Sequence, residues 1–249
     1  MRMIRFVVIL LSMMISIPTS AFTTNDERID HYLKILNSPN LKRTQKMVER
    51  LQWSGVSDPR LFDDLEKRIF EHYLDEEIDG RLENLLAHMV RALGYSGNEK
   101  YRVSLAKIID KTPLWKLEKH AKKALVDLDM HSEWNELVAA SSISVEGKSI
   151  EVSTYMKMLD VDDILLQRMA ARAIYNEHHN DSELLDLAAN KLKLLYMEPG
   201  LDKISIDAAA WLIKAIGQSG ESKYAELLTE VASATPYEKI GKYAVKFSY

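Results

Sequence analysis

The chain has 249 residues, of which 47% are hydrophobic and 28% are charged, and its formal net charge is −4 at pH 7. A mildly acidic chain has no overall electrostatic attraction to nucleic acid, so we expect no nucleic-acid partner. The chain contains no cysteine, which excludes disulfide bonds and leaves side-chain packing as the source of stability.

The first 21 residues have the composition of a secretory signal peptide. Arg2 and Arg5 precede an uncharged apolar run at 6–17, and Ala21 is a small residue suited to cleavage. The run is shorter than the about 20 apolar residues that a membrane-spanning helix needs, so we expect it to be removed rather than kept as an anchor. The sequence therefore predicts an exported protein without membrane insertion, periplasmic in a Gram-negative host and secreted in any other.

Two halves of the chain have related sequences. A shift of 123 positions aligns residues 32–125 with 155–248 without a gap, and 22 of the 94 pairs are identical. The clearest match pairs "ALGYSGNEKY" at 92–101 with "AIGQSGESKY" at 215–224. Because shared composition rarely keeps one register over such a distance, we predict an internal duplication. The predicted organisation is a signal peptide at 1–21, a lead-in at 22–31, a first module at 32–128, a connector at 129–154 and a second module at 155–249.

Apolar residues recur at helical spacing throughout both copies. The stripe at 82–93 is typical, with apolar residues at Leu82, Leu85, Leu86, Met89, Val90 and Leu93. Only the segment 142–153 has some of the alternation typical of a strand. One helix pair cannot cover both of its apolar faces, so pairs must stack in a row. The predicted fold is all-α, an α-solenoid of two tandem duplicated modules.

Glycines and capping residues mark the predicted ends of the helices. Asp58 and Thr235 each precede a proline and are predicted to begin helices, and the spacing of Thr235 from Glu238 is that of a capping box. Gly94 and Gly217 occupy equivalent positions near a turn, where a small residue allows two helices to approach closely. Three glycines that follow a serine are predicted to close helices in the left-handed conformation: Gly55, Gly97 and Gly220.

These helix–turn–helix units repeat roughly every 40 residues, and the chain thereby resembles HEAT or armadillo-type helical repeat proteins. The segments "LQWSGVSDPRLFDDLEKR" and "RALGYSGNEKYRVSLAKI" are similar to those of exported bacterial HEAT-repeat proteins of unassigned activity. The resemblance covers about 32–128 and 155–248, and it departs at 175–180, where the second copy lacks the Trp-Ser-Gly turn of the first. It implies a binding or assembly scaffold and no catalytic residues.

Lysines recur at equivalent positions of the two copies and are the candidate binding residues. Three lysines in each copy follow the i, i+3, i+7 spacing of one helix face, so we predict two matched basic ridges for a carboxylate or phosphate partner. The alternative is a solvated helix face without a ligand. The candidate residues are Lys100, Lys116, Lys119, Lys123, Lys223, Lys239, Lys242 and Lys246.

Two other groups of residues were weighed as sites. His178 and His179 stand between acidic residues, but no third ligand follows at metal-site spacing, so we interpret them as a polar turn and expect no metal and no cofactor. The four tryptophans are not shared between the copies, and each is predicted to fill a local gap in the core rather than to contact a partner. They are Trp53, Trp115, Trp134 and Trp211.

The sequence contains no recognisable catalytic motif. We therefore expect a non-catalytic scaffold that binds a protein, a peptide or an anionic envelope component through its helical-repeat surface. The alternative is a cell-envelope hydrolase or lyase that uses carboxylates in the groove of the solenoid. A purely structural part of an assembly is a third interpretation.

Overall fold

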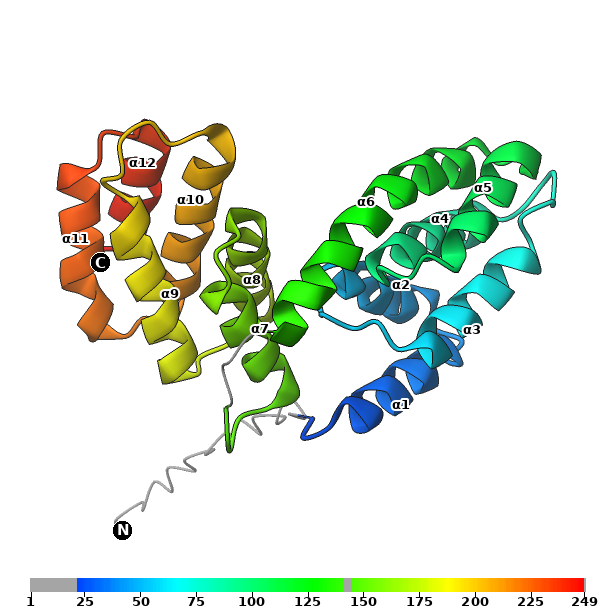
Figure 1. Cartoon of the computed structure of the whole chain (residues 1–249), viewed down its shortest axis with the longest axis horizontal. Helices are drawn as coiled ribbons and strands as arrows, with labels where there is room; N and C mark the ends of the chain where they lie inside the picture. The colour runs from blue at the N-terminus through cyan, green and yellow to red at the C-terminus, as the bar shows by residue number, and fades with distance from the viewer. Residues whose placement is uncertain (1–21, 141–144, 249) are drawn as a thin grey trace, which may run out of the picture.

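The computed structural model describes residues 22–140 and 145–248, so the predicted signal peptide at 1–21 lies outside the described residues. Twelve α-helices and no strand occur in those two ranges, which confirms the all-α prediction (Figure 1). In the segment 142–153, residues 150–153 form the first turn of a helix. We call residues 22–140 the first half and residues 145–248 the second half.

Each half contains six α-helices. In the first half they are α1 (Asn25–Leu36), α2 (Leu41–Arg50), α3 (Pro59–Phe70), α4 (Gly80–Tyr95), α5 (Tyr101–Lys111) and α6 (Trp115–Ala140), with a 3-10 turn, η1 (Leu51–Trp53), after α2. In the second half they are α7 (Ile150–Asp160), α8 (Ile164–Glu177), α9 (Ser182–Leu195), α10 (Lys203–Gly217), α11 (Ala225–Ala234) and α12 (Glu238–Phe247), with η2 (Ser222–Tyr224) before α11.

Four helices of each half begin at positions that the sequence alignment pairs. Helices α2, α3, α4 and α6 begin at residues 41, 59, 80 and 115, and α8, α9, α10 and α12 begin at residues 164, 182, 203 and 238. Each helix of the second set begins 123 positions after its counterpart, which is the shift that aligns the two sequences. The related sequences therefore form related helices.

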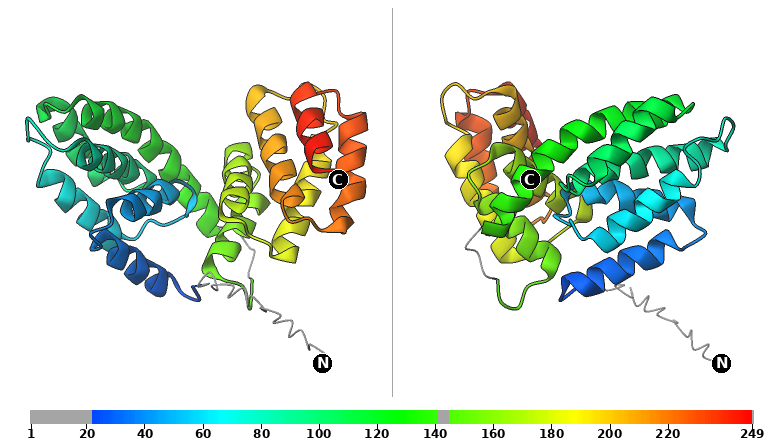
Figure 2. Two further views of the ribbon diagram at one scale, coloured as in Figure 1. Left: turned by 180° about the vertical axis from the view of Figure 1, so that it is seen from behind. Right: turned by 45° about the vertical axis from the view of Figure 1, so that its right-hand side comes forward.

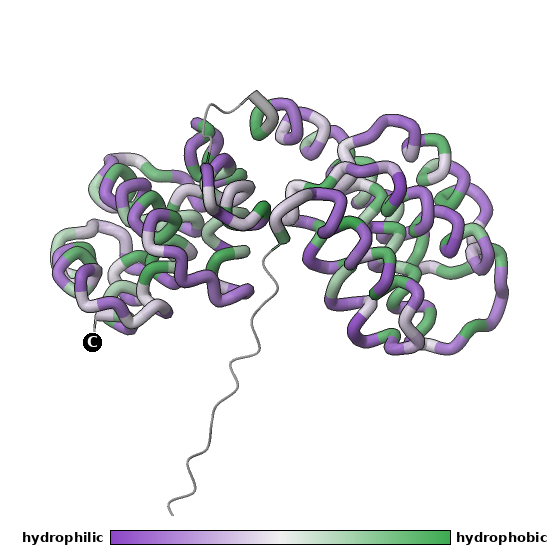
Figure 3. The backbone as a smooth tube through the Cα atoms, turned by 90° about the horizontal axis from the view of Figure 1, so that it is seen from below, coloured by the Kyte–Doolittle hydropathy of each residue, from purple (hydrophilic) through white to green (hydrophobic). Residues whose placement is uncertain are grey.

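The even-numbered helices of each half pack side by side. In the first half α4 contacts both α2 and α6, and in the second half α10 contacts both α8 and α12. The odd-numbered helices pack against this layer, and the long α6 runs toward α7 and α8, where the halves meet (Figure 2). Hydrophobic and hydrophilic residues alternate along each helix, as expected for helices with one buried side (Figure 3).

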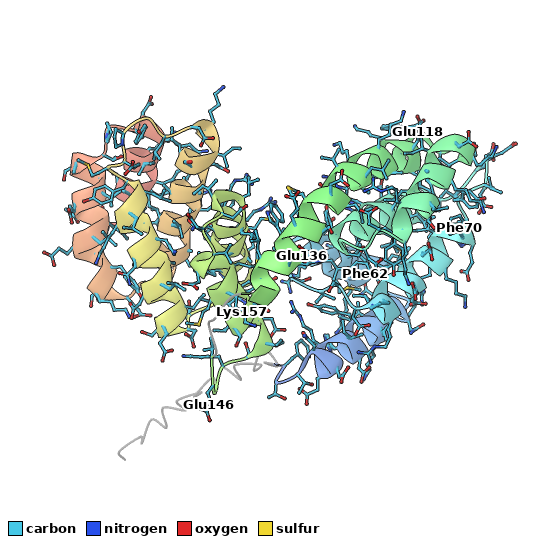
Figure 4. The ribbon with its side chains drawn as sticks, viewed as in Figure 1. Phe62, Phe70, Glu118, Glu136, Glu146 and Lys157 are labelled. Atoms are coloured by element: carbon cyan, nitrogen blue, oxygen red, sulfur yellow. The ribbon has the colours of Figure 1, made fainter. Side chains whose placement is uncertain are left out.

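Two hydrophobic clusters form the core. One lies within the first half and includes the fully buried Phe62, whereas the other fills the second half and also takes in Trp53 and Trp134 from the first. In Figure 4, Phe62 lies inside the first half, and Glu136 of α6 and Lys157 of α7 lie where the halves meet. The core is thus shared across the junction between the halves.

The structure confirms most of the predicted helix ends. The carboxylate of Asp58 accepts from the backbone N–H of Arg60 at the start of α3, and Gly55, Gly97 and Gly220 have φ of 65°, 60° and 69°. The predicted capping box at 235–238 is wrong, because the N-cap of α12 is Tyr237, which makes no side-chain cap. The hydroxyl of Thr235 instead donates to the carbonyl oxygen of Tyr196, at 2.8 Å.

Helices pack tightly at the two equivalent glycines, as predicted. A Cβ placed on Gly94 would lie 2.9 Å from the Cα of Ala124, and one placed on Gly217 would lie 2.5 Å from the Cβ of Phe247. Both distances are shorter than a normal carbon contact, so only glycine fits without a shift of the neighbouring helix. The repeated glycine therefore sets how closely α4 approaches α6, and α10 approaches α12.

Helix α6 continues through much of the segment that the sequence predicted as a connector at 129–154. The described part of α6 reaches Ala140, and α7 begins at Ile150. Helix α6 is longer than its counterpart α12. Leu128, His131 and Trp134 lie in the additional part of α6, and all three are buried. This extension carries Trp134 into the core of the second half.

Candidate functional site

A pocket of about 600 Å³ lies where the N-terminal helices of the first half meet the beginning of the second. We call it the junction pocket. It is lined by α1 and α2 on one side, and by α7 with the turn between α8 and α9 on the other. Its lining residues are Phe22, His31, Tyr32, Ile35, Arg43, Lys46, Met47, Arg50, Ser149, Glu151, Val152, Glu177, His179 and Asp181.

A left-handed turn places two of these residues in the pocket. His178 follows α8 as its C-cap with φ of 56°, and it is the only residue other than glycine with positive φ in the described ranges. It stands 123 positions after Gly55, so the second copy makes the same turn with a histidine, at a backbone cost that glycine avoids. The turn directs Glu177 and His179 toward each other, with Glu177 Oε2 3.1 Å from His179 Nε2.

Glu177 is the centre of a hydrogen-bond network that joins the halves. Its Oε1 accepts from the indole Nε1 of Trp53 at 2.9 Å, and its Oε2 accepts from the hydroxyl of Tyr155 at 2.8 Å. The guanidinium Nε of Arg50 lies 3.9 Å from Oε1. Burial alone would raise the pKa of Glu177, but the hydrogen bonds from His179, Trp53 and Tyr155 outweigh it and lower the pKa below its usual value. Glu177 is therefore a firmly held anion.

Two buried groups stabilise the wall behind Glu177. Burial, reinforced by the Glu177 carboxylate, raises the pKa of the fully buried Tyr155 hydroxyl well above its usual value, so this group stays a neutral donor. Arg28 is only 1% exposed, and its Nε donates to the Tyr32 hydroxyl at 3.1 Å and lies 3.6 Å from Glu151. A buried cation is costly without a partner, so Arg28 holds Glu151 in place.

The acidic residues of the junction pocket already have partners within the protein. Glu151 pairs with Arg28, Glu177 accepts the hydrogen bonds described above, and Asp181 lies 2.8 Å from the Nζ of Lys148 and caps α9. Arg28 and Lys148 thus offset the charges of Glu151 and Asp181, and hydrogen bonds occupy both oxygens of Glu177.

The basic residues of the pocket have few acidic partners within the protein. Arg43, Lys46 and Arg50 follow i, i+3, i+7 spacing on one face of α2, and we call them the α2 ridge. Within the described residues, Arg43 and Lys46 form no ion pair, and Arg50 reaches Glu177 only at 3.9 Å. Apolar side chains at Ile35 and Met47 lie beside them. The pocket therefore combines uncompensated positive charge with an apolar wall, an arrangement suited to an anionic group attached to an apolar one.

The predicted lysines do not lie in this pocket, and four of them are in ion pairs. Lys100 pairs with Asp63 at 2.5 Å and its equivalent Lys223 pairs with Asp186 at 2.7 Å. Lys116 pairs with Glu83 at 2.8 Å. Its equivalent Lys239 pairs with Asp207 at 2.5 Å, so these lysines join neighbouring helices. The other four, Lys119, Lys123, Lys242 and Lys246, are exposed and have no ion pair within the described residues.

Sequence reasoning missed the α2 ridge, although its spacing is visible in the sequence. The ridge occurs in one copy only, because the equivalent positions of the second copy are apolar and buried in α8. The tryptophan prediction is correct in part: Trp53 and Trp134 are buried at 9% and 5% exposure, but Trp115 is 61% exposed. Trp211 is half-buried on the surface of α10.

Two kinds of feature are absent from residues 22–140 and 145–248. No group of three His, Asp or Glu side chains there is placed to hold a metal ion. No helix in the same ranges has the length and apolar composition needed to cross a membrane.

Comparison with known proteins finds no matching family model, no similar curated protein and no similar solved structure. The function is therefore inferred from the geometry of this chain alone.

Proposed function

We propose that the chain is an exported, non-catalytic scaffold with the architecture of a HEAT-like α-solenoid, built from two duplicated modules. It binds a protein, a peptide or an envelope component through the surface of its stacked helices. The junction pocket is its principal site and receives an anionic group of the partner.

The architectural part of the proposal is supported by the common register of the two halves. Four helices of the first half and four of the second begin at the shift that aligns their sequences. Stacked helix pairs form extended concave surfaces that are suited to binding other macromolecules. Export is supported by the charge and apolar pattern of residues 1–21.

The binding part rests on a single observation, the imbalance of partners within the junction pocket. Each acid of the pocket is paired with a donor of the protein, whereas Arg43 and Lys46 have no counter-ion within the described residues. A carboxylate or phosphate of a partner would meet the α2 ridge, and its apolar portion would lie on Ile35 and Met47.

The alternative, a cell-envelope hydrolase or lyase, has one observation in its favour. Glu151, Glu177, His31 and His179 line the same pocket, so carboxylates and imidazoles lie close together. Glu177, however, is a poor proton acceptor, because its hydrogen bonds occupy both oxygens and lower its pKa. The enzyme hypothesis predicts that a captured component is cleaved and that Glu151→Gln blocks cleavage while capture continues.

Site-specific photo-crosslinking tests the binding proposal. A photoreactive amino acid replaces Lys46, which lines the pocket, or Lys42, which is exposed on the same helix outside it. In an envelope extract of the host, we expect a crosslinked product at position 46 that excess unmodified protein competes away. We expect no such product at position 42, and we expect Arg43→Glu to abolish the product at position 46. No product at position 46, or equal products at both positions, would contradict the proposal.

A further inference from the structure

A row of alternating rings and cations crosses from the first half to the second, on α8, α10 and α12. The guanidinium Cζ of Arg172 lies 5.2 Å from the ring centroid of Trp53 and 5.8 Å from that of Trp211. The ammonium of Lys214 lies 3.7 Å from the Trp211 ring and 4.4 Å from the Tyr243 ring. We call these five residues the cation–ring ladder. Each cation is thus held between two aromatic rings.

The two cations of the ladder have no acidic partner. Neither Arg172 nor Lys214 forms an ion pair within the described residues, and the buried Nε of Arg172 has no hydrogen-bond partner there. Both side chains are half-buried, as are the rings of Trp211 and Tyr243, so a ligand can reach them. Rings attract a cation but do not neutralise it, so the positive charge of the ladder stays available to an anion.

The equivalent surface of the first half is neutralised by its own residues. Shifted by 123 positions, Lys214 corresponds to Arg91, and the Nη2 of Arg91 donates to buried Asp127 at 2.9 Å. Trp211 corresponds to His88, whose Nε2 lies 3.3 Å from Glu49. Glu49 itself corresponds to Arg172, so the second half has a cation where the first has an acid. The two copies therefore present different chemistry from the same backbone positions.

We propose that the cation–ring ladder is a docking surface for an acidic peptide segment of a partner protein. Carboxylates of the segment meet Arg172 and Lys214, and its backbone and apolar side chains lie on Trp211 and Tyr243. The rings fix the position of both cations before the segment arrives, which reduces the conformational entropy lost on binding. This surface shares no residue with the lining of the junction pocket.

The charges of the chain favour a peptide over a nucleic acid as the occupant. Stacking rings beside cations also suit single-stranded nucleic acid, which binds through many phosphate contacts. The ladder has only two cations, and the whole chain has a net charge of −4. A short segment with a few carboxylates matches this limited positive charge, whereas the many phosphates of a nucleic acid find too few cations here and are repelled more strongly by the net negative charge.

Peptide titration tests the inference. The probe is a fluorescein-labelled decapeptide of alternating glutamate and tyrosine. Fluorescence anisotropy measures its affinity for a protein that comprises residues 22–249. We expect saturable binding that weakens with added salt, and a loss of about tenfold or more for Lys214→Glu. Lys214→Arg should retain most of the affinity. The matched control is Lys193→Glu, the same charge change at an exposed position of α9, and it should bind as the unaltered protein does.

Four results would overturn the inference. They are an equal loss in the Lys193→Glu protein, full affinity in the Lys214→Glu protein, no saturable binding, and tighter binding of a single-stranded oligonucleotide of the same length. Circular dichroism checks that each variant is folded. A Lys46→Glu variant separates binding at the cation–ring ladder from binding at the junction pocket, and we expect it to keep the peptide affinity. Loss of affinity in this variant alone would place the peptide in the junction pocket.

Discussion

The indole Nε1 of Trp53 donates a hydrogen bond of 2.9 Å to the Oε1 of Glu177, which is 124 positions away along the chain. Trp53 ends the 3-10 turn after α2, and Glu177 ends α8, so the bond connects the two halves at the ends of helices that correspond in the sequence alignment. Trp53 also lies under the guanidinium of Arg172. The same side chain thus donates to Glu177, which lines the junction pocket, and forms one end of the cation–ring ladder.

Tyr155→Phe tests how much the Glu177 network contributes to stability. The substitution removes only the hydroxyl that donates to Glu177 at 2.8 Å, and it leaves the ring packed in a fully buried site. A hydrogen bond to a charged group contributes about 1.5–3 kcal/mol, so we expect the free energy of unfolding to fall by about that amount. Chemical denaturation measures the change.

The control for this prediction is Tyr73→Phe. Tyr73 is also buried, at 7% exposure, and its hydroxyl makes no hydrogen bond within the described residues. We expect a loss of less than about 0.5 kcal/mol there. Equal losses in the two variants would show that the hydroxyl of Tyr155 has no special role.

Gly94→Ala should destabilise the contact between α4 and α6. The new Cβ would lie 2.9 Å from the Cα of Ala124, and a backbone atom cannot move aside as a side-chain end can. Overpacking of this kind costs about 1–3 kcal/mol. Gly80→Ala is the control, because nothing lies within 4 Å of its added Cβ, and we expect it to be neutral or slightly stabilising. Thermal unfolding of both variants decides the matter, and equal melting temperatures would contradict close packing at Gly94.

Acid should destabilise the protein through His131. Burial and the nearby Arg91 guanidinium lower the pKa of His131 to about 4, from an ordinary value near 6.5. Below about pH 6.5 the unfolded chain therefore binds a proton that the folded chain does not, and the free energy of unfolding falls as the pH drops toward 4. For one proton the slope approaches about 1.4 kcal/mol per pH unit.

His131→Phe should reduce that slope. The ring lies between those of Tyr95 and Trp134, at centroid distances of 5.3 and 5.0 Å, and its buried Nε2 has no hydrogen-bond partner within the described residues. Denaturation curves at pH 7, 6, 5 and 4 provide the measurement. The control is His72→Gln, at a partly exposed site, which should keep the slope of the unaltered protein. An unchanged slope in His131→Phe would show that His131 does not cause the pH dependence. The pKa of His120 is also lowered to about 4, so part of the slope remains in either variant.

The fold was largely predictable, because local sequence determines most of it. Helical spacing predicted the all-α structure. As predicted, Asp58 caps α3, Gly55 has a left-handed backbone at a turn, and Gly94 allows close contact between two helices. The predicted capping box is wrong because the Thr235 hydroxyl donates instead to the carbonyl oxygen of Tyr196, the residue that follows α9. Such tertiary competition cannot be read from local spacing.

The junction pocket was not predictable from spacing alone. Its walls come from α2 and from the turn after α8, and only the folded chain brings these segments together. Lysines were predicted as binding residues because they recur in the two halves. Recurring residues such as Lys100 and Lys223, however, form ion pairs with acids at equivalent positions. The α2 ridge occurs in one copy only, so a search for repeated residues passed over it.

A reciprocal exchange at the two corresponding turns tests whether their backbones are equivalent. Gly55 and His178 both have positive φ, 65° and 56°, and occupy the same position of the two copies. We expect Gly55→His to lose about 1–3 kcal/mol, because a left-handed backbone disfavours a side chain and a Cβ there would lie 2.7 Å from the Cγ2 of Thr154. His178→Gly should keep or raise the stability by up to about 1 kcal/mol, since glycine adopts this conformation without strain and the only side-chain hydrogen bond lost is the exposed one to Gln218. Chemical denaturation of both variants gives the two values. If His178→Gly instead lost as much stability as Gly55→His, the histidine ring would stabilise the turn by more than its backbone strain costs, and the two turns would not be equivalent.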